Sequence, residues 1–314
     1  MSTAPYISWL GHGLASFAPP EVFTGANFHL FTIQASTAAV QQLVETLLNP
    51  AGGGQVRYDA ALPVAILTFC DAAKCTSQAQ PIGWLPGREA MILLPLWEFR
   101  SGNPLPSRLV FWAPYIFIDY TIGLVSGREI WGYPKVFARI TVAADQPGAD
   151  YSCETTIFPK FAASTPAKNA VLYRVVQAQS AVQAPEPWQD AAEAGRAVTQ
   201  GLLGGLAADV FQALSTQPRV DCVVLKQFRE TSAPTLACYQ AITDSPIALT
   251  GFSAGGLLPG QFTVEIATCD SHTIVSDLLG TTPGPVSTVL PVTFAAWASV
   301  DYSALPGKDI VVVT

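Results

Sequence analysis

The sequence has few charged residues, which make up 12% of its 314 positions. Lysine and arginine together number 16, against 23 aspartates and glutamates, so the net charge at pH 7 is −7. No basic cluster is present, and nucleic-acid binding depends on such a cluster. The composition therefore argues against a nucleic-acid partner.

Long apolar runs are also missing, although 50% of the residues are hydrophobic. None approaches the roughly 18 residues that a membrane helix needs, so we expect a large buried core and no membrane association. The length suits one large domain, which we expect to span residues 1–314. Because obligate interfaces are depleted of charge at their centres, the low charge also predicts a homo-oligomer.

Metal-binding and redox patterns are sparse. The three histidines, His12, His29 and His272, are too few and too far apart for a metal site or a catalytic triad. The six cysteines form no Cys-x-x-Cys pair, which argues against a zinc site and a dense disulfide framework. The segment around Ser253 has hydrolase-like spacing, but prolines and glycines come after it where a helix is required. We expect no metal and no cofactor.

The opening segment has no cationic residue before its apolar stretch, and His12 and two prolines interrupt the apolar residues. A secretory signal needs a positively charged start and an unbroken apolar run. We therefore expect a cytoplasmic protein.

Apolar and β-branched runs recur between turns rich in proline and glycine, a pattern typical of β-strands. We expect strands at residues 29–34, 64–70, 90–97, 109–118, 136–143, 170–176, 220–228, 236–242, 247–252, 262–268 and 286–300. Helices are expected at 37–48, 120–126 and about 188–215. The predicted fold class is mainly β with a few helices (α+β), and so many strands favour a barrel or a sandwich.

One lysine stands out in the segment 127–135, which reads Gly-Arg-Glu-Ile-Trp-Gly-Tyr-Pro-Lys. Pro134 restricts the backbone just before Lys135 and favours extended geometry at Tyr133. Apolar surroundings disfavour a charged ammonium, and a neutral amine can attack a carbonyl carbon. Arg128 would add to this effect, because a guanidinium opposes a second positive charge nearby. These residues predict Lys135 as a nucleophile.

Other interpretations of these residues stay open. A lysine after Tyr-Pro could simply extend from a turn into water. Among the six lysines, Lys160 also comes after a proline but lacks the arginine and the glycine pair, and Lys226 in a strand-like run is the second candidate. Arg128 and Glu129 could hold the loop together without taking part in chemistry.

The spacing Gly-Arg-Glu, three residues, Tyr-Pro-Lys resembles the signature of the acetoacetate decarboxylase family. The resemblance extends over roughly residues 20 to 300, through the strand that ends at Asp119 and the later runs around Lys226, Ala241 and Gly256. It implies a large antiparallel β-barrel or curved sheet, with about 185–216 as a helical insertion that serves as a lid or, as we favour, in assembly. It also implies a Schiff-base lysine at Lys135.

The resemblance further implies roles for residues around the lysine. A family glutamate lies six residues before a proline, and Glu89 with Pro95 fits that spacing, whereas Glu98 is the competing acid/base candidate. Trp131, Glu129 and Gln227 would line the substrate pocket.

Four departures separate the chain from well-known decarboxylases. Val136 stands where those enzymes carry a second lysine, and Thr68 stands about where they carry a second glutamate. Their early arginine has no counterpart near Asn27, and the large Trp131 occupies a pocket position. We therefore expect a divergent member that acts on a keto acid other than acetoacetate.

Three functions remain open. The first is a Schiff-base lyase of the decarboxylase type, which acts on a small-molecule keto substrate through Lys135, with Glu89 and Arg128 as its other catalytic residues. The second keeps the lysine but performs aldol, dehydration or cyclisation chemistry on a larger keto substrate. The third is a non-catalytic protein that binds an apolar carbonyl ligand.

Overall fold

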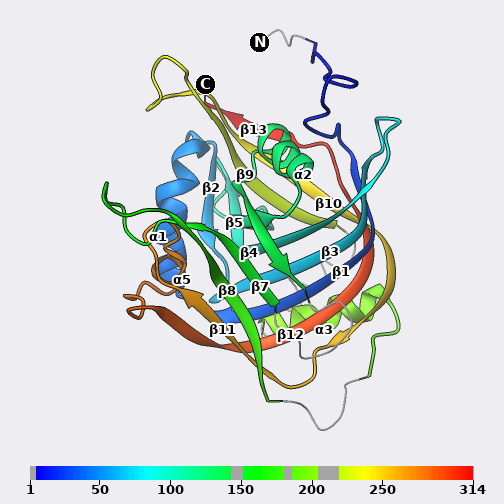
Figure 1. The fold of residues 1–314 in the computed structure, drawn as a ribbon, viewed down its shortest axis with the longest axis vertical. Helices are drawn as coiled ribbons and strands as arrows, with labels where there is room; N and C mark the ends of the chain where they lie inside the picture. The colour runs from blue at the N-terminus through cyan, green and yellow to red at the C-terminus, as the bar shows by residue number, and fades with distance from the viewer. Residues whose placement is uncertain (1–4, 143–150, 180–185, 204–218, 314) are drawn as a thin grey trace.

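The computed structural model describes residues 5–142, 151–179, 186–203 and 219–313 (Figure 1). The strands are β1 (Glu21–Gln34), β2 (Val56–Ala60), β3 (Val64–Ser77), β4 (Leu85–Arg100), β5 (Arg108–Ile118), β6 (Lys135–Thr141), β7 (Tyr151–Ile157), β8 (Lys168–Gln179), β9 (Arg219–Arg229), β10 (Ala237–Leu257), β11 (Gln261–Ala267), β12 (Ser287–Ala304) and β13 (Lys308–Val312). The helices are α1 (Thr37–Leu47), α2 (Thr121–Ser126), α3 (Ala191–Leu203) and α5 (Ile274–Leu279), with short turns η1 (Asn49–Gly52) and η2 (Gly127–Trp131).

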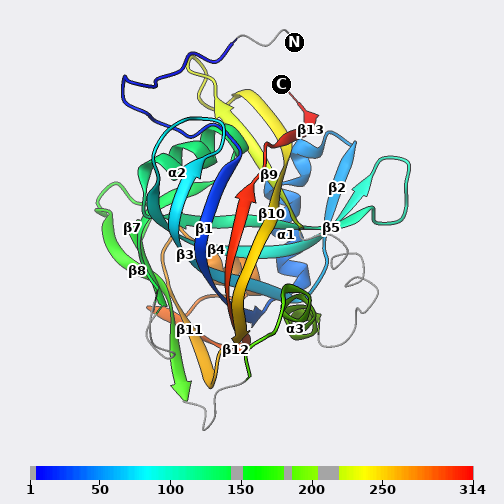
Figure 2. The ribbon, with the colours of Figure 1, turned by 90° about the vertical axis from the view of Figure 1, so that its right-hand side faces the viewer.

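The strands form one 13-stranded curved sheet in the order β13-β10-β9-β5-β6-β7-β8-β11-β12-β1-β3-β4-β2. Further pairings of β10 with β12 and of β5 with β4 close part of it into a ring of β4, β5, β9, β10, β12, β1 and β3. Figure 2 shows β10, β12, β1 and β3 side by side along this wall. The predicted fold class, mainly β with a few helices, is confirmed.

Not every pair in the sheet is antiparallel. Strand β5 runs parallel to both β6 and β9. Parallel neighbours need a crossover connection, and between β5 and β6 this connection is α2 followed by η2. The crossover holds the Gly-Arg-Glu segment, so it brings that segment to the end of β5.

Alternation along the shared strands separates two hydrophobic clusters. The main cluster contains Phe31, Phe69 and Ile92, and α1 and α5 contribute to it. A smaller cluster on the other face contains Cys70 and Ile118. Successive side chains of a strand point to opposite faces, and directly paired residues share a face. Glu89 pairs with both Cys70 and Ile118, so its carboxylate points toward the smaller cluster.

A helix lies at each of the three positions where the sequence predicted one. Ser36 caps α1 by accepting a hydrogen bond from Ala39 N, and Val40 and Val44 face the core. Helix α3 packs on β12 and β10 (Figure 1). The predicted segment at about 185–216 thus contains a helix, and residue 185 and residues 204–216 lie outside the described residues.

The strand predictions differ from the structure in three ways. β2, β7, β13 and helix α5 were missed, and β1 begins at Glu21, eight positions before the expected start at His29. The two strands expected at 236–242 and 247–252 are the single strand β10. Pro246, between the two expected strands, lies within β10 opposite Asp221.

Candidate functional site

The signature segment forms a tight turn between α2 and β6. Residues Gly127–Trp131 make a π-helical turn, and Gly127 O accepts hydrogen bonds from Gly132 N and Tyr133 N, each at 2.9 Å. Gly132 has a φ of 90°, which a residue with a side chain rarely adopts. A Cβ at this position would also lie 2.4 Å from Lys226 Cα. The second glycine of the signature is therefore required by the backbone.

Lys135 begins β6, and its side chain lies across Gly127. A Cβ on Gly127 would lie 2.4 Å from Lys135 Cδ. The Nζ atom lies 2.6 Å from Oε1 of Glu89, and each residue keeps only 7% of its surface exposed. Such a pair is stable in a protein interior only while both partners are present. The tertiary structure thus joins the two residues that the sequence paired only by resemblance.

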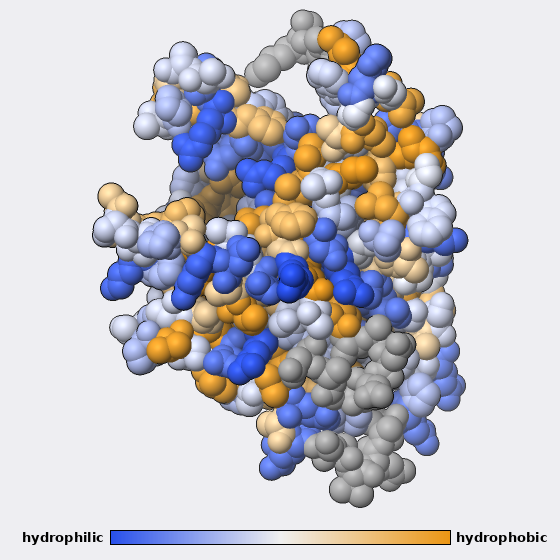
Figure 3. All heavy atoms as spheres, in the orientation of Figure 1, coloured by the Kyte–Doolittle hydropathy of each residue, from blue (hydrophilic) through white to orange (hydrophobic). Residues whose placement is uncertain are grey.

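Arg128 and Glu129 are exposed, and Nη1 of Arg128 donates to Lys135 O at 3.0 Å. Both line a groove of about 520 Å³ together with Tyr133 and Gln227. The groove runs between α2, the signature turn and β9, and in the space-filling view hydrophobic side chains gather over α2 and the N-terminal segment (Figure 3). Three sequence-predicted residues therefore meet at one groove, whose lining includes Pro134, the residue before the lysine, but not Lys135 itself.

Trp131 lies apart from these three residues. It is buried, and its Nε1 donates to Leu305 O at 2.8 Å. A Cβ on Gly307 would lie 3.3 Å from its ring. Trp131 is not among the residues that line the groove. Its position anchors the signature turn to the segment between β12 and β13.

Tyr133 points inward from the signature. Its hydroxyl lies 3.0 Å from Ser245 Oγ, and Lys135 Nζ lies 6.0 Å from the centre of its ring. Burial raises the pKa of this phenol well above its usual value, so it stays neutral at pH 7. Lys226 donates from Nζ to Ile130 O at 2.8 Å. Lys226 therefore supports the turn from outside, whereas Lys135 is buried beneath it.

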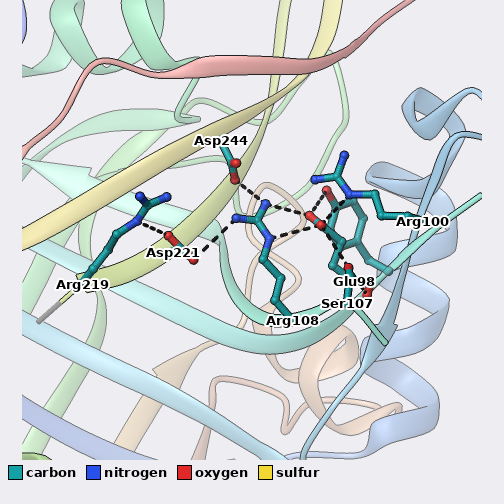
Figure 4. A network of polar contacts seen from close by, with 8 residues as sticks. Glu98, Arg100, Ser107, Arg108, Arg219, Asp221 and Asp244 are labelled. Atoms are coloured by element: carbon teal, nitrogen blue, oxygen red, sulfur yellow. Dashed lines mark hydrogen bonds and ion pairs between the residues drawn. The ribbon is translucent and has the colours of Figure 1, made fainter. Parts of the chain in front are cut away.

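Glu98 lies in a different set of contacts (Figure 4). Its Oε2 is 2.9 Å from Arg108 Nη2, and its Oε1 is 2.8 Å from Arg100 Nε. Arg108 also reaches Asp244 at 2.5 Å and Asp221 at 3.5 Å. Burial raises the pKa of Glu98, but the bonds and charges of Arg108 and Arg100 outweigh it and hold the pKa below its usual value. This network ties β4, β5, β9 and β10 together.

Glu21 was not among the site residues predicted from the sequence. It begins β1, is 2% exposed, and carries an Oε1 atom without a hydrogen-bond partner among the described residues. The register shift between Phe23 and Ala26, at Gly25, breaks the alternation of β1, which is why the expected strand began too late. A carboxyl just after Pro19-Pro20 and just before an apolar run was the available signal.

Residues 10–165 match the family model described as acetoacetate decarboxylase. Acetoacetate decarboxylase from Legionella pneumophila has a similar structure, with a TM-score of 0.60 and 13% sequence identity over 100% of this chain and 99% of that chain. The chain is a divergent member of the acetoacetate decarboxylase-like superfamily. No curated protein matches its sequence.

Two further proteins with this superfamily's fold are similar in structure. An acetoacetate decarboxylase-like enzyme from Sphingomonas wittichii RW1 gives a TM-score of 0.56 at 14% identity, over 93% of each chain. The enduracididine biosynthesis enzyme MppR, complexed with the condensation product of pyruvate and imidazole 4-carboxaldehyde, gives 0.57 at 14% identity, over 99% of each chain. At these identities the likeness shows the fold.

The departures from the family pattern have clear positions in the structure. Val136, where well-known decarboxylases have a second lysine, is 37% exposed and points away from the Lys135–Glu89 pair. Thr68 is buried at 5% exposure on β3, and its Oγ1 has no hydrogen-bond partner among the described residues. Neither position supplies a charge to the lysine, so the charges around it differ from the family pattern.

The described ranges hold no group of three or more histidine, cysteine, aspartate or glutamate residues that could bind a metal ion. In the same part of the chain, no helix is long and apolar enough to span a membrane.

Proposed function

We propose that the protein is a Schiff-base-forming lyase in which Lys135 condenses with a keto acid or a related carbonyl compound. The observation that carries this proposal is the buried pair of Lys135 and Glu89, with 2.6 Å between Nζ and Oε1. A hydrogen bond of this length gives Glu89 direct access to a proton of the lysine. Once that proton has passed, Nζ has a lone pair with which to attack a carbonyl carbon. Activated lysines of this kind are the basis of acetoacetate decarboxylation.

The groove beside the lysine is the proposed route for the substrate. Arg128 is exposed on its wall, and a guanidinium binds a carboxylate through two parallel hydrogen bonds. Gln227 adds a neutral polar side chain to the same groove. A carbonyl compound that carries a carboxylate fits this lining, which is why we propose a keto acid.

A second reaction class stays open for the same lysine. MppR, which shares the fold, was obtained with the condensation product of pyruvate and an aldehyde. An iminium on Lys135 could equally stabilise the carbanion of an aldol, dehydration or cyclisation reaction without loss of carbon dioxide. The two reactions share the covalent step and differ in the bond that breaks next.

Reductive trapping tests the covalent step. The protein is incubated with acetoacetate or pyruvate, borohydride is added, and the modified residue is identified by mass spectrometry. We expect an adduct on Lys135 that is lost in Lys135→Ala. Lys160→Ala is the matched control, because Lys160 also comes after a proline but is exposed.

The outcomes of trapping distinguish between the candidate nucleophiles and between the candidate functions. An adduct on Lys226, or full turnover by Lys135→Ala, would overturn the assignment of the nucleophile. The absence of an adduct with any keto compound would favour a binding protein without catalysis. Where adducts form, release of carbon dioxide separates the decarboxylase from the condensing enzyme.

A further inference from the structure

A second buried carboxyl lies beside the Lys135–Glu89 pair. Glu21 is 2% exposed, and its Oε1 has no hydrogen-bond partner among the described residues. A buried oxygen left without a partner costs free energy comparable to a lost hydrogen bond. Neither the signature segment nor the groove explains why a carboxyl is kept at this position.

Two consecutive residues of the crossover, Ser126 and Gly127, connect Glu21 with the lysine. Glu21 faces the hydroxyl of Ser126, the last residue of α2, and this hydroxyl lowers the pKa of Glu21. The next residue, Gly127, lies against the lysine, and a Cβ there would be 3.1 Å from Lys135 Nζ. Ser126 itself is fixed, because its Oγ accepts a hydrogen bond from Phe17 N at 2.8 Å. Glu21 and Lys135 therefore both lie against one short backbone segment, Ser126 and Gly127.

The charges near Glu21 come from the same site. Burial raises the pKa of Glu21 to about 7, while Lys135 and the Ser126 hydroxyl lower it and Glu89 raises it. Tyr120 and Cys75 also face Glu21, but burial raises the pKa of the Tyr120 phenol well above its usual value and that of the Cys75 thiol to about 12. Both are neutral at pH 7. Within the described part of the chain, the ionic groups that face Glu21 are therefore Lys135 and Glu89.

We infer that Glu21 is a second acid–base group of this site, which donates a proton to the carbonyl oxygen of the substrate as Lys135 attacks. The inference rests on the proposed function. It gives the two carboxyls different tasks, because Glu89 touches the amine directly and Glu21 has an oxygen that no described residue contacts by a hydrogen bond.

The proton transfers balance with these two groups alone. Glu89 first takes a proton from the Lys135 ammonium. The Nζ lone pair then forms the bond to the carbonyl carbon, and the oxygen receives the electron pair and a proton from Glu21. Glu21 next takes a proton from the new nitrogen centre, and Glu89 returns its proton to the hydroxyl, which leaves as water. The products are a positive iminium, a Glu89 carboxylate and a protonated Glu21, with the net charge unchanged.

The test is the pH dependence of adduct formation. The initial rate of reductive trapping with acetoacetate or pyruvate is measured from pH 5.5 to 9 for the unmodified protein, Glu21→Gln and Ser126→Ala. We expect the rate of the unmodified protein to fall as the pH rises through about 7, because Glu21 then loses its proton. Glu21→Gln should be slower at pH 6 by about 100-fold, and its profile should lack this fall.

Ser126→Ala provides a readout that a merely structural role of Glu21 would not change. The Ser126 hydroxyl lowers the pKa of Glu21, so its removal should move the fall in rate to higher pH. Glu45→Gln, which removes an exposed carboxylate, should leave the profile unchanged. Circular dichroism and thermal melting establish that each variant is folded.

The outcomes separate this inference from the function on which it rests. If the unmodified protein forms no adduct on Lys135, the proposed function fails. If it does form the adduct and folded Glu21→Gln keeps both the rate and the fall near pH 7, the role of Glu21 is overturned. A profile that does not move in Ser126→Ala would count against Glu21 in the same way.

Discussion

Gly127 lies so close to Lys135 that a side chain at position 127 would occupy the space of the lysine. An added Cβ would be 2.4 Å from Lys135 Cδ and 2.6 Å from Cε. The glycine therefore opens the path by which Nζ reaches Glu89. The first glycine of the signature serves the position of the lysine, and the second serves the turn.

Gly127→Ala should therefore slow adduct formation strongly but lower the stability of the protein only slightly. The methyl group would push the flexible lysine aside and break its contact with Glu89. We expect the trapping rate to fall at least about tenfold and the free energy of unfolding to change by only about 1 kcal/mol. Gly83→Ala is the control, because a Cβ at Gly83 would meet no atom within 4 Å. Equal trapping rates in the two variants would contradict the proposed role of Gly127.

Glu21 should make the stability of the protein depend on pH. Its pKa is about 7 in the folded state, against 4.5 for a solvated glutamate. Between these values the folded state binds more protons, so stability is full below pH 4.5 and decreases as the pH rises through about 7. Glu21→Gln should lack this decrease, which amounts to about 3 kcal/mol between pH 4.5 and 8. Urea unfolding at both pH values measures it, with Glu45→Gln as control.

His29 should have the opposite effect in acid. Burial lowers the pKa of His29 from 6.5 to about 4, although Asp71 partly opposes the shift. Stability is therefore full above pH 6.5 and is lost as the pH falls toward 4, by up to about 3 kcal/mol. His29→Gln should be less stable at pH 7 but should lose less on acidification. The exposed His12 supplies the control His12→Gln, whose acid profile should match that of the unmodified protein.

Glu98 and Glu89 should respond differently to loss of the carboxylate. Glu98 is 1% exposed and bonds two arginines, so Glu98→Ala removes two charge-assisted contacts and should cost about 2 kcal/mol of stability. Its folded fraction should still form the adduct on Lys135. Glu89→Gln should instead abolish most adduct formation because the proton acceptor is gone. Trapping at matched folded fractions compares the two, and a larger loss in Glu98→Ala would reverse our choice between them.

The arginine network shows why Glu89 and Glu98 were hard to tell apart in the sequence. Both lie on β4 and both are buried. However, β4 is 16 residues long, so its two ends reach different parts of the molecule. One end pairs with the last residues of β5, next to the crossover, and the other pairs with Arg108. Only the pairing partners distinguish a carboxylate beside a lysine from one among arginines.

The amino-acid sequence by itself determined the β-rich class, most of the strands, the crossover helix and the tight turn that ends in Lys135. Strand periodicity, prolines and glycines act locally, so these features depend on neighbours in the chain. Only the tertiary structure decided which carboxyls meet the lysine. Glu21, Glu89 and Lys135 come from β1, β4 and β6, and their proximity depends on the register of a closed sheet. All three side chains are buried there, so each one interacts with the charges that the fold brings near it.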